Sequence, residues 1–553
     1  MSCLLSSALK PGPGRGWLRL SGWPRTAERL QHRGDRVIRS GNSVSVGSGP
    51  GRGRWRWGWL LGLGLGLGLA VGVRPSGCES EEAAVEEEVE KRRRAFGRAI
   101  AQSRDLLRMI KDESGVPGIV VGVSVDGKEV WSEGLGFADV ENRVPCKPTT
   151  VMRIASISKP LTMMAVARLW QEGKLDFDAP VQNYVPEFPE KEFEGEKVTI
   201  TTRMLVSHLS GIRHYEKDIQ AVRDEKAKKA SKLTSDAANK RAEENANEEK
   251  ESKKDKDIAR KKEKSTAKNE AATAKPEQDK ETRPAREKKE FDKEEYYLKE
   301  KFENVIASLE LFKNDPLVFK PGSQFLYSTH AWTLVSAVVE RASGQKFLDY
   351  MKKMFHDLGM HTTVQEEHDP MIYNRARFYV YNNKSRLVNA PYVDNSYKWA
   401  GGGFLSTVGD LLIFGNAMLY SYQAKQFHSL GQKLLPGYLQ PDTMAMMWLP
   451  VPNTEMAWDR DGKYGMGWGT VEKRQEYGQC RQQRHYVSHT GGAVGASSVL
   501  LVLPQDLDSV DVNNGVLPPP RGVVVTVICN MQSTGLNSTA LKIALEFEKD
   551  RAV

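Results

Sequence analysis

The stretch Arg153-Ile154-Ala155-Ser156-Ile157-Ser158-Lys159-Pro160 is the one around which the rest of this chain is organised. It places a hydroxyl and an amine three residues apart at the start of an apolar run with helical spacing, so both would share one helix face. A serine is a poor nucleophile unless a base takes its proton, and a lysine in dry surroundings can lose its charge and serve. Ser156 and Lys159 are therefore the candidate reaction centre. The same spacing recurs at Ser7/Lys10, Ser265/Lys268 and Ser343/Lys346, so context must decide between the pairs.

Length and charge set the first limits. The chain has 553 residues and a formal net charge of +9, which allows more than one domain or a domain with targeting and linker segments. Much of the basic charge lies in an Arg-rich N-terminus and a mixed-charge middle, not on one face, so we exclude nucleic acid as a partner. The cysteines lack the spacing of a zinc or redox motif, and we expect no disulfide framework, metal or cofactor: they are Cys3, Cys78, Cys146, Cys480 and Cys529.

The N-terminal region has the composition of a targeting sequence. Residues 1–57 are rich in Arg, Gly and Ser, with Glu28 and Asp35 as the only acids, which predicts a mitochondrial transit segment; a disordered basic arm is the alternative. Residues 58–77 begin with an uncharged Gly- and Leu-rich run that would form a helix too short for a stable membrane span. We interpret it as a sorting or anchor segment. Together they predict association with the mitochondrial inner membrane and a mature protein in the intermembrane space.

The remaining sequence predicts one catalytic domain of mixed helices and strands, formed by residues 78–215 and 300–553. Apolar spacing indicates amphipathic helices near both ends of this domain, and Asp126-Gly127 between two β-rich runs indicates a hairpin. We expect an α/β (α+β) fold, with one antiparallel sheet covered by the terminal helices and a mainly helical portion built from the middle. The expected segments are helices at 85–110, 152–170 and 539–549, and strands at 464–471, 486–502 and 523–530.

A charged segment interrupts the domain. Residues 216–299 are dominated by Lys, Glu, Ala and Asp and contain few large aliphatic residues. Such a composition buries too little apolar surface to offset the entropy of ordering. We interpret the segment as a solvated low-complexity insertion, either disordered or a charged helical arm, which the fold tolerates as a loop.

Three short motifs, far apart in the chain, occur in a meaningful order: Ser156-Ile157-Ser158-Lys159, Tyr327-Ser328-Thr329 and His489-Thr490-Gly491-Gly492. With the phrases 205–211, 401–407 and 464–468, the chain resembles the serine β-lactamase and penicillin-binding-protein superfamily, nearest the class C and D-alanyl-D-alanine carboxypeptidase branch. The resemblance covers roughly residues 95–215 and 300–550 and leaves the insertion unexplained.

The resemblance implies a role for each motif residue. Ser156 would be acylated, Lys159 would help to deprotonate it, and Tyr327 would carry the proton to the leaving group. His489 would contact a substrate carboxylate or support Tyr327, close to Thr490 and Thr329. The N–H groups of Ser156 and Gly492 would form the oxyanion hole, and Gly491 with Gly492 would let a substrate backbone approach. Structural alternatives remain: a helix cap for Ser156, a surface lysine for Lys159, a core aromatic for Tyr327, and structural roles for His489 and for His208.

Two departures from the pattern bear on the substrate. Thr329 stands where that branch usually has asparagine, and His489 replaces a lysine with its permanent charge. Both argue against β-lactam hydrolysis. Our leading hypothesis is a peptidase or amidase that works through an acyl-Ser156 intermediate on a peptide substrate. The alternatives are an esterase acting on lipid-like esters and a self-assembling structural protein, a homo-oligomer or filament, that retains the fold.

Overall fold

A computed structural model describes residues 94–229, 231, 294–428, 438–475, 482–505 and 520–551. The predicted transit segment 1–57, the predicted anchor segment 58–77 and most of the predicted insertion 216–299 lie outside the described residues. Within the described part of the chain, no helix is long and apolar enough to cross a membrane. All of the described residues lie in the unit that begins at Pro75.

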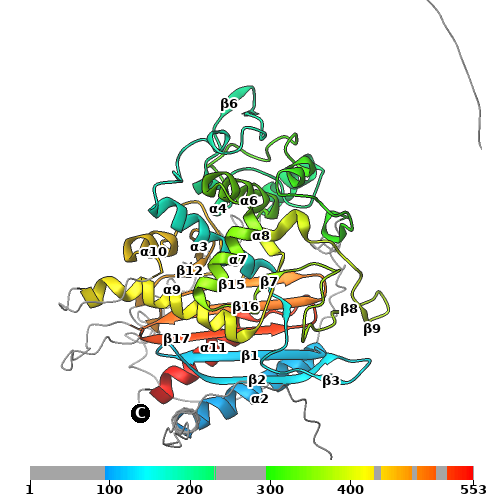
Figure 1. The fold of residues 1–553 in the computed structure, drawn as a ribbon, viewed down its shortest axis with the longest axis vertical. Coiled ribbons are helices and arrows are strands. Elements are labelled where there is room, and N and C mark those ends of the chain that lie inside the picture. The colour runs from blue at the N-terminus through cyan, green and yellow to red at the C-terminus, as the bar shows by residue number, and fades with distance from the viewer. Residues whose placement is uncertain are drawn as a thin grey trace, which may run out of the picture. The chain divides into compact units, whose positions relative to one another are not determined.

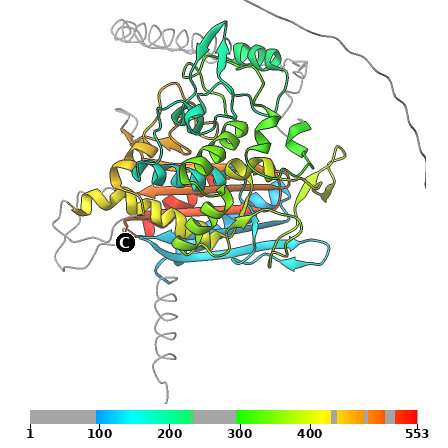
Figure 2. The same cartoon turned by 45° about the horizontal axis from the view of Figure 1, so that its top comes forward.

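An antiparallel sheet of eight described strands forms the centre of this unit (Figure 1). It brings together strands from near the two ends of the described unit, because β1, its first strand in sequence, pairs with β17, its last (Figure 2). In spatial order, the strands are β11 (Lys463–Tyr464), β12 (Gly469–Val471), β15 (Tyr486–Ala493), β16 (Ala496–Pro504), β17 (Gly522–Cys529), β1 (Gly118–Val125), β2 (Lys128–Asp139) and β3 (Val144–Pro145).

The predicted hairpin at Asp126-Gly127 is confirmed and joins β1 to β2. Both turn residues have positive φ, 51° and 78°, as a two-residue type I′ turn requires. The predicted strand at 486–502 is instead a hairpin, in which Gly495 turns the chain between β15 and β16 with a φ of 71°. The run at 464–471 is likewise two short paired strands. Neither turn carries the Asn-Gly or Asp-Gly signal that marks the first hairpin.

Helices from opposite ends of the chain cover one face of the sheet, as predicted. They are α2 (Gly97–Ser114) and α11 (Asn537–Arg551), and their apolar residues share a buried cluster with alternate residues of β1 such as Val121 and Val123. The other face packs against α9 (Val408–His428) and the helical portion, through residues such as Val120. This alternation gives the sheet two apolar faces, so it is buried between two layers.

The helical portion comes from the middle of the chain and lies above the sheet in Figure 1. Its helices are α3 (Ser158–Gln171), α4 (Thr202–Val206), α6 (Thr329–Ser343), α7 (Phe347–Leu358), α8 (Trp399–Gly402) and α10 (Pro441–Trp448). Small strands accompany them: β4 (Met152–Arg153), β10 (Phe404–Ser406) and β7 (Val364–Gln365) form one sheet, and β5 (Lys191–Phe193) with β6 (Glu196–Val198), β8 (Tyr379–Tyr381) with β9 (Leu387–Asn389), and β13 (Arg474–Gln475) with β14 (Gln482–Gln483) form pairs.

The helix expected at 152–170 begins later than predicted. Met152 and Arg153 form β4, paired with β10, and a 3-10 turn, η1 (Ala155–Ile157), precedes α3. Pro160 is tolerated in the first turn of α3 because the N–H groups there lack helical partners in any case. The sheet pairing of β4 overrides the helical spacing that the apolar residues suggested.

Candidate active site

Ser156 lies on η1, between β4 and α3, in a backbone that is under strain. The preceding residue, Ala155, has a φ of 49°, which is unfavourable for a residue with a side chain. Ser498 Oγ donates a hydrogen bond of 2.7 Å to the carbonyl of Ile154 and so ties this turn to β16. Arg153 pairs with the buried carboxylate of Glu366 at 2.8 Å on the other side. These contacts hold the half-buried Ser156 in a fixed position against the sheet.

Lys159 is fully buried one helical turn from Ser156, and its amine faces the serine hydroxyl. Lys159 Nζ lies 3.0 Å from Ser156 Oγ and donates a 2.7 Å hydrogen bond to the carbonyl of Gly401. A neutral amine can donate one N–H to that carbonyl and still offer its lone pair to the serine O–H. The arrangement therefore suits proton abstraction from Ser156.

The tyrosine of the second motif lies over the same amine. Lys159 Nζ is 4.7 Å from the centre of the Tyr327 ring, and that ring is itself half-buried. The next residue, Ser328, caps α6 by accepting a hydrogen bond from the N–H of Ala331. The structure thus brings together Ser156, Lys159 and Tyr327, three residues that the sequence analysis selected from two distant motifs.

The third motif runs along β15, directly beside the nucleophile turn. A Cβ at Gly491 would lie 2.4 Å from the Ile154 carbonyl and 3.1 Å from the Ala155 Cβ, so only glycine allows β15 to pass this close. Gly492 is exposed and Thr490 is half-buried on the same strand. Among the described strands, β12 pairs with β15 only as far as Ser488, which leaves the edge from His489 onward open beside Ser156.

His489 is fully buried, and both ring nitrogens have protein partners. Nδ1 lies 2.6 Å from the carbonyl of Thr490, and Nε2 lies 2.8 Å from the hydroxyl of Tyr464. Burial, followed by the charge of Lys159, lowers the pKa of His489 to about 3, so the ring is neutral at pH 7. The expected contact with a substrate carboxylate does not fit, because the ring offers neither a positive charge nor an unoccupied nitrogen. Its ring lies 6.4 Å from that of Tyr327.

Thr329 is also turned into the protein. Its side chain packs against Gly401, where a Cβ would meet the Thr329 methyl at 2.8 Å, and its backbone N–H donates to His214 Nδ1 at 3.2 Å. The residue is almost fully buried. The place of the usual asparagine amide is thus taken by a methyl group packed beside the carbonyl partner of Lys159.

Several residues of the site were missed or undervalued by the sequence analysis. His208 accepts a 3.1 Å hydrogen bond from the N–H of Ser328 through Nδ1, and the centre of its ring lies 4.3 Å from that of Tyr327, with the two rings tilted. Burial lowers its pKa well below the usual value, in keeping with the structural role expected for it. The phrases around Gly401 and Tyr464 entered only as part of the resemblance, but they supply the acceptor for Lys159 and the partner for His489.

A family profile described as Beta-lactamase matches residues 96–250 and 282–546. The chain belongs to the beta-lactamase family. Its relatives include the serine beta-lactamase-like protein LACTB, mitochondrial, of Mus musculus, 68% identical over 464 residues that cover 83% of this chain and 82% of the relative. The Homo sapiens protein of the same name is 66% identical, with 83% and 81% covered.

A solved structure shows the beta-lactamase-family fold independently of close sequence similarity. The octameric penicillin-binding protein homologue from Pyrococcus abyssi superimposes with a TM-score of 0.52 at 19% identity, over 81% of this chain and 77% of that one. The predicted α/β fold of the superfamily is confirmed. Membership supports a serine hydrolase, and the names of the relatives support a mitochondrial protein.

Proposed function

We propose that this mitochondrial beta-lactamase-family protein hydrolyses amide bonds of peptide substrates through an acyl-Ser156 intermediate. The observation that carries the proposal is the buried Lys159 amine, 3.0 Å from Ser156 Oγ and beneath the Tyr327 ring. This is the geometry of a nucleophile within reach of its base, with a second proton carrier alongside.

The reaction would proceed in two halves. Lys159 takes the Ser156 proton as Oγ attacks the substrate carbonyl, and the N–H groups of Ser156 and Gly492 donate hydrogen bonds to the oxyanion that forms. Tyr327 and Lys159 deliver the proton to the leaving amine as the carbon–nitrogen bond breaks. A water molecule, deprotonated by the same pair, then attacks the acyl carbon; the bond from that carbon to Ser156 Oγ breaks, and the pair returns the proton to Oγ, which releases the acid and free Ser156.

The open edge of β15 favours an extended peptide as substrate. The backbone from His489 to Ala493 has no strand partner on that side among the described residues. An extended peptide can add to such an edge through main-chain hydrogen bonds, with the exposed Gly492 leaving room for its backbone. This observation supports a peptide over a lipid-like ester.

A labelling experiment tests the nucleophile. A fluorophosphonate probe should modify Ser156, as located by mass spectrometry, and Ser156→Ala should abolish both the labelling and any peptide cleavage. Ser343→Ala is the matched control, because Ser343 and Lys346 have the same spacing, yet Ser343 is the last residue of α6, directly before its C-cap Gly344. Probe on another serine of the folded protein, or none, would contradict the proposal. Turnover of short esters without peptide cleavage would select the esterase instead.

We further propose that the mature protein faces the intermembrane space, attached to the inner membrane, and associates with its own copies. The support is the composition of residues 1–77, which lie outside the described residues, and the charged segment between the halves of the domain. Protection of the intact protein from protease in mitochondria with ruptured outer membranes would contradict the location. A monomer at all concentrations in size-exclusion chromatography would contradict the self-association.

A further inference from the structure

The short segment that carries Tyr327 is not held by a regular sheet. It is instead held by bonds to the stretch 208–214: Leu326 N–H donates to the His208 carbonyl at 3.0 Å, and the N–H groups of Ser328 and Thr329 donate to histidine side chains. The position of the tyrosine therefore depends on what holds that neighbouring stretch and the start of α6.

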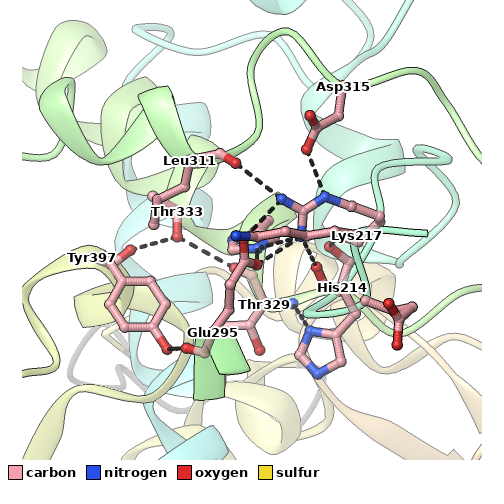
Figure 3. A network of polar contacts seen from close by, with 12 residues as sticks. His214, Lys217, Glu295, Leu311, Asp315, Thr329, Thr333 and Tyr397 are labelled. Atoms are coloured by element: carbon pink, nitrogen blue, oxygen red, sulfur yellow. Dashed lines mark hydrogen bonds and ion pairs between the residues drawn. The ribbon is translucent and has the colours of Figure 1, made fainter. Parts of the chain in front are cut away.

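The C-terminal end of the predicted insertion supplies one such support. Glu295, on the 3-10 turn η4 (Glu294–Tyr297), is 2% exposed and makes two hydrogen bonds with Arg213, of 2.7 and 3.0 Å (Figure 3). The same carboxylate lies 2.9 Å from His330 Nε2, in the first turn of α6. Glu295 thus joins the stretch before the insertion to the helix that follows Tyr327.

Arg213 passes this support on to the tyrosine motif. All five of its N–H groups are used: Glu295 takes two, and Asp315 and the carbonyls of His214 and Leu311 take the others. The carbonyl of Arg213 accepts a 2.7 Å hydrogen bond from Ser328 Oγ, next to Tyr327. Because every donor of the Arg213 side chain is bonded, the backbone of Arg213, including the carbonyl that accepts from Ser328, is restrained as well.

The N-terminal end of the insertion supports the chain just before the motif. Residues 219–229 are helical, and Arg223 on this helix donates to the carbonyls of Leu317 and Val318 at 2.9 and 3.0 Å. Lys226 Nζ donates to the carbonyl of Phe325, two residues before Tyr327, and lies over the Phe319 ring. Both ends of the segment therefore contact the backbone around the tyrosine.

We propose that the two ends of the charged segment hold Tyr327 in register with Lys159, with Glu295 and Lys226 as positioning residues. This inference rests on the proposed catalytic role of Tyr327. The proposal assigns this support to the two ends of the segment alone. Displacing the tyrosine by about 1 Å is enough to cost up to 10²-fold in rate without removing any reacting group.

Paired substitutions in the full chain test the two supports. Glu295→Gln keeps the shape of the side chain and removes its charge, and Glu294→Gln, at an exposed neighbour, is its control. Lys226→Met removes the donor to Phe325, and Lys229→Met, at the exposed Lys229 on the same helix, is its control. We expect Glu295→Gln and Lys226→Met to lower kcat by about 10- to 100-fold with KM within about twofold, and the controls to match wild type.

Three further measurements separate positioning from loss of folding. Lys226→Arg keeps a cationic donor and should restore kcat, which a merely destabilised variant would not do. The pH profile of kcat should change shape in Glu295→Gln, at a temperature where circular dichroism shows the protein folded. Replacing residues 232–293 by a Gly/Ser linker of equal length should leave kcat unchanged, since both ends remain.

The outcomes are distinguishable from a failure of the proposed function. If Ser156→Ala retains activity, the proposed chemistry is wrong whatever the other variants do. If Ser156→Ala is inactive but Glu295→Gln and Lys226→Met behave as their controls do, the chemistry stands and the positioning inference is overturned. A loss of kcat on replacement of 232–293 would also overturn it, because the middle of the segment would then be required.

Discussion

Two buried cations, Lys159 and Arg213, lie on either side of the Tyr327 motif and are stabilised in different ways. Arg213 is paired with two carboxylates, those of Glu295 and Asp315. Burial opposes its charge, but the hydrogen bonds and charges of Glu295 and Asp315 together outweigh burial, and the pKa of Arg213 is raised. Lys159, fully buried, donates instead to a hydroxyl and a backbone carbonyl, those of Ser156 and Gly401.

The difference separates a side chain that keeps its proton, Arg213, from one whose partners suit both protonation states, Lys159. A guanidinium does not lose its proton in proteins, so the ion pairs between Arg213 and its carboxylate partners persist and have a structural role. A hydroxyl can accept a hydrogen bond from an ammonium or donate one to an amine, so Lys159 keeps suitable partners in both of its protonation states. The first arrangement stabilises the fold around the site, and the second suits chemistry within it.

The largest expected effect is the loss of catalysis on removing the lysine amine. Lys159→Met keeps the length and burial of the side chain and should lower the rate of fluorophosphonate labelling of Ser156 by about 10²- to 10⁴-fold. Stability should change little, because a buried charge is replaced by an apolar group of similar volume. The free energy of unfolding, from urea titration, measures the second quantity.

Another buried lysine provides the control for Lys159→Met. Lys191 Nζ donates to the backbone carbonyls of Lys313 and Asp315, with no hydroxyl among these partners. Lys191→Met should leave labelling within about twofold of wild type, since this amine is not a base for Ser156. Equal losses of labelling in both variants would refute the distinction between the two kinds of site.

For stability, the opposite result is expected for Arg213, whose replacement should lower the free energy of unfolding strongly. Arg213→Met leaves the carboxylate of Glu295 buried without its guanidinium, which should cost about 3–5 kcal/mol of unfolding free energy. Lys229→Met, which breaks the exposed pair with Glu455, should cost less than about 1 kcal/mol. Urea unfolding followed by tryptophan fluorescence compares the two. A loss at Arg213 no larger than at Lys229 would show that burial of the pair contributes nothing.

The sequence predicted the parts of the site that rest on local patterns. The spacing of Ser156 and Lys159 and the order of the three motifs sufficed to place the candidate centre, and the Asp126-Gly127 turn sufficed for one edge of the sheet. Each of these features depends on a few neighbouring residues, so it can be recognised without knowledge of the fold. Family membership and the antiparallel sheet with its terminal helices are confirmed.

Other parts of the site could not be predicted because they depend on tertiary contacts. Glu295 sits in a stretch whose composition indicates a solvated loop, and contacts with the distant Arg213 and His330 make its burial favourable. Likewise, nothing near His489 in sequence indicates that Tyr464 and the carbonyl of Thr490 occupy its nitrogens and leave it neutral. The helix expected from Met152 failed for the same reason, because β10 pairs with those residues.

The smallest expected effect is on the pH dependence of stability. It distinguishes the surroundings of Lys159 from those of Arg213 through the histidine near each, His489 and His330. Burial is the main cause that lowers the pKa of His489 to about 3 and that of His330, beside Glu295, to about 4. The unfolded chain binds protons at these residues below about pH 6.5, whereas the folded protein does not. Stability is therefore full above that pH and falls as the pH decreases, by about 2 kcal/mol per histidine at pH 5.

Substitutions assign that loss to one centre or the other. His489→Gln and His330→Gln should each remove about 2 kcal/mol from the difference in unfolding free energy between pH 7 and pH 5. Lys159 contributes to the lowered pKa of His489 but is not among the causes at His330. Lys159 also lowers the pKa of His208, so Lys159→Met should weaken the pH dependence due to His489 and His208 and leave that due to His330 unchanged. If it changed the contribution of His330 equally, the two cations would be coupled, and the separation between a structural and a chemical centre would fail.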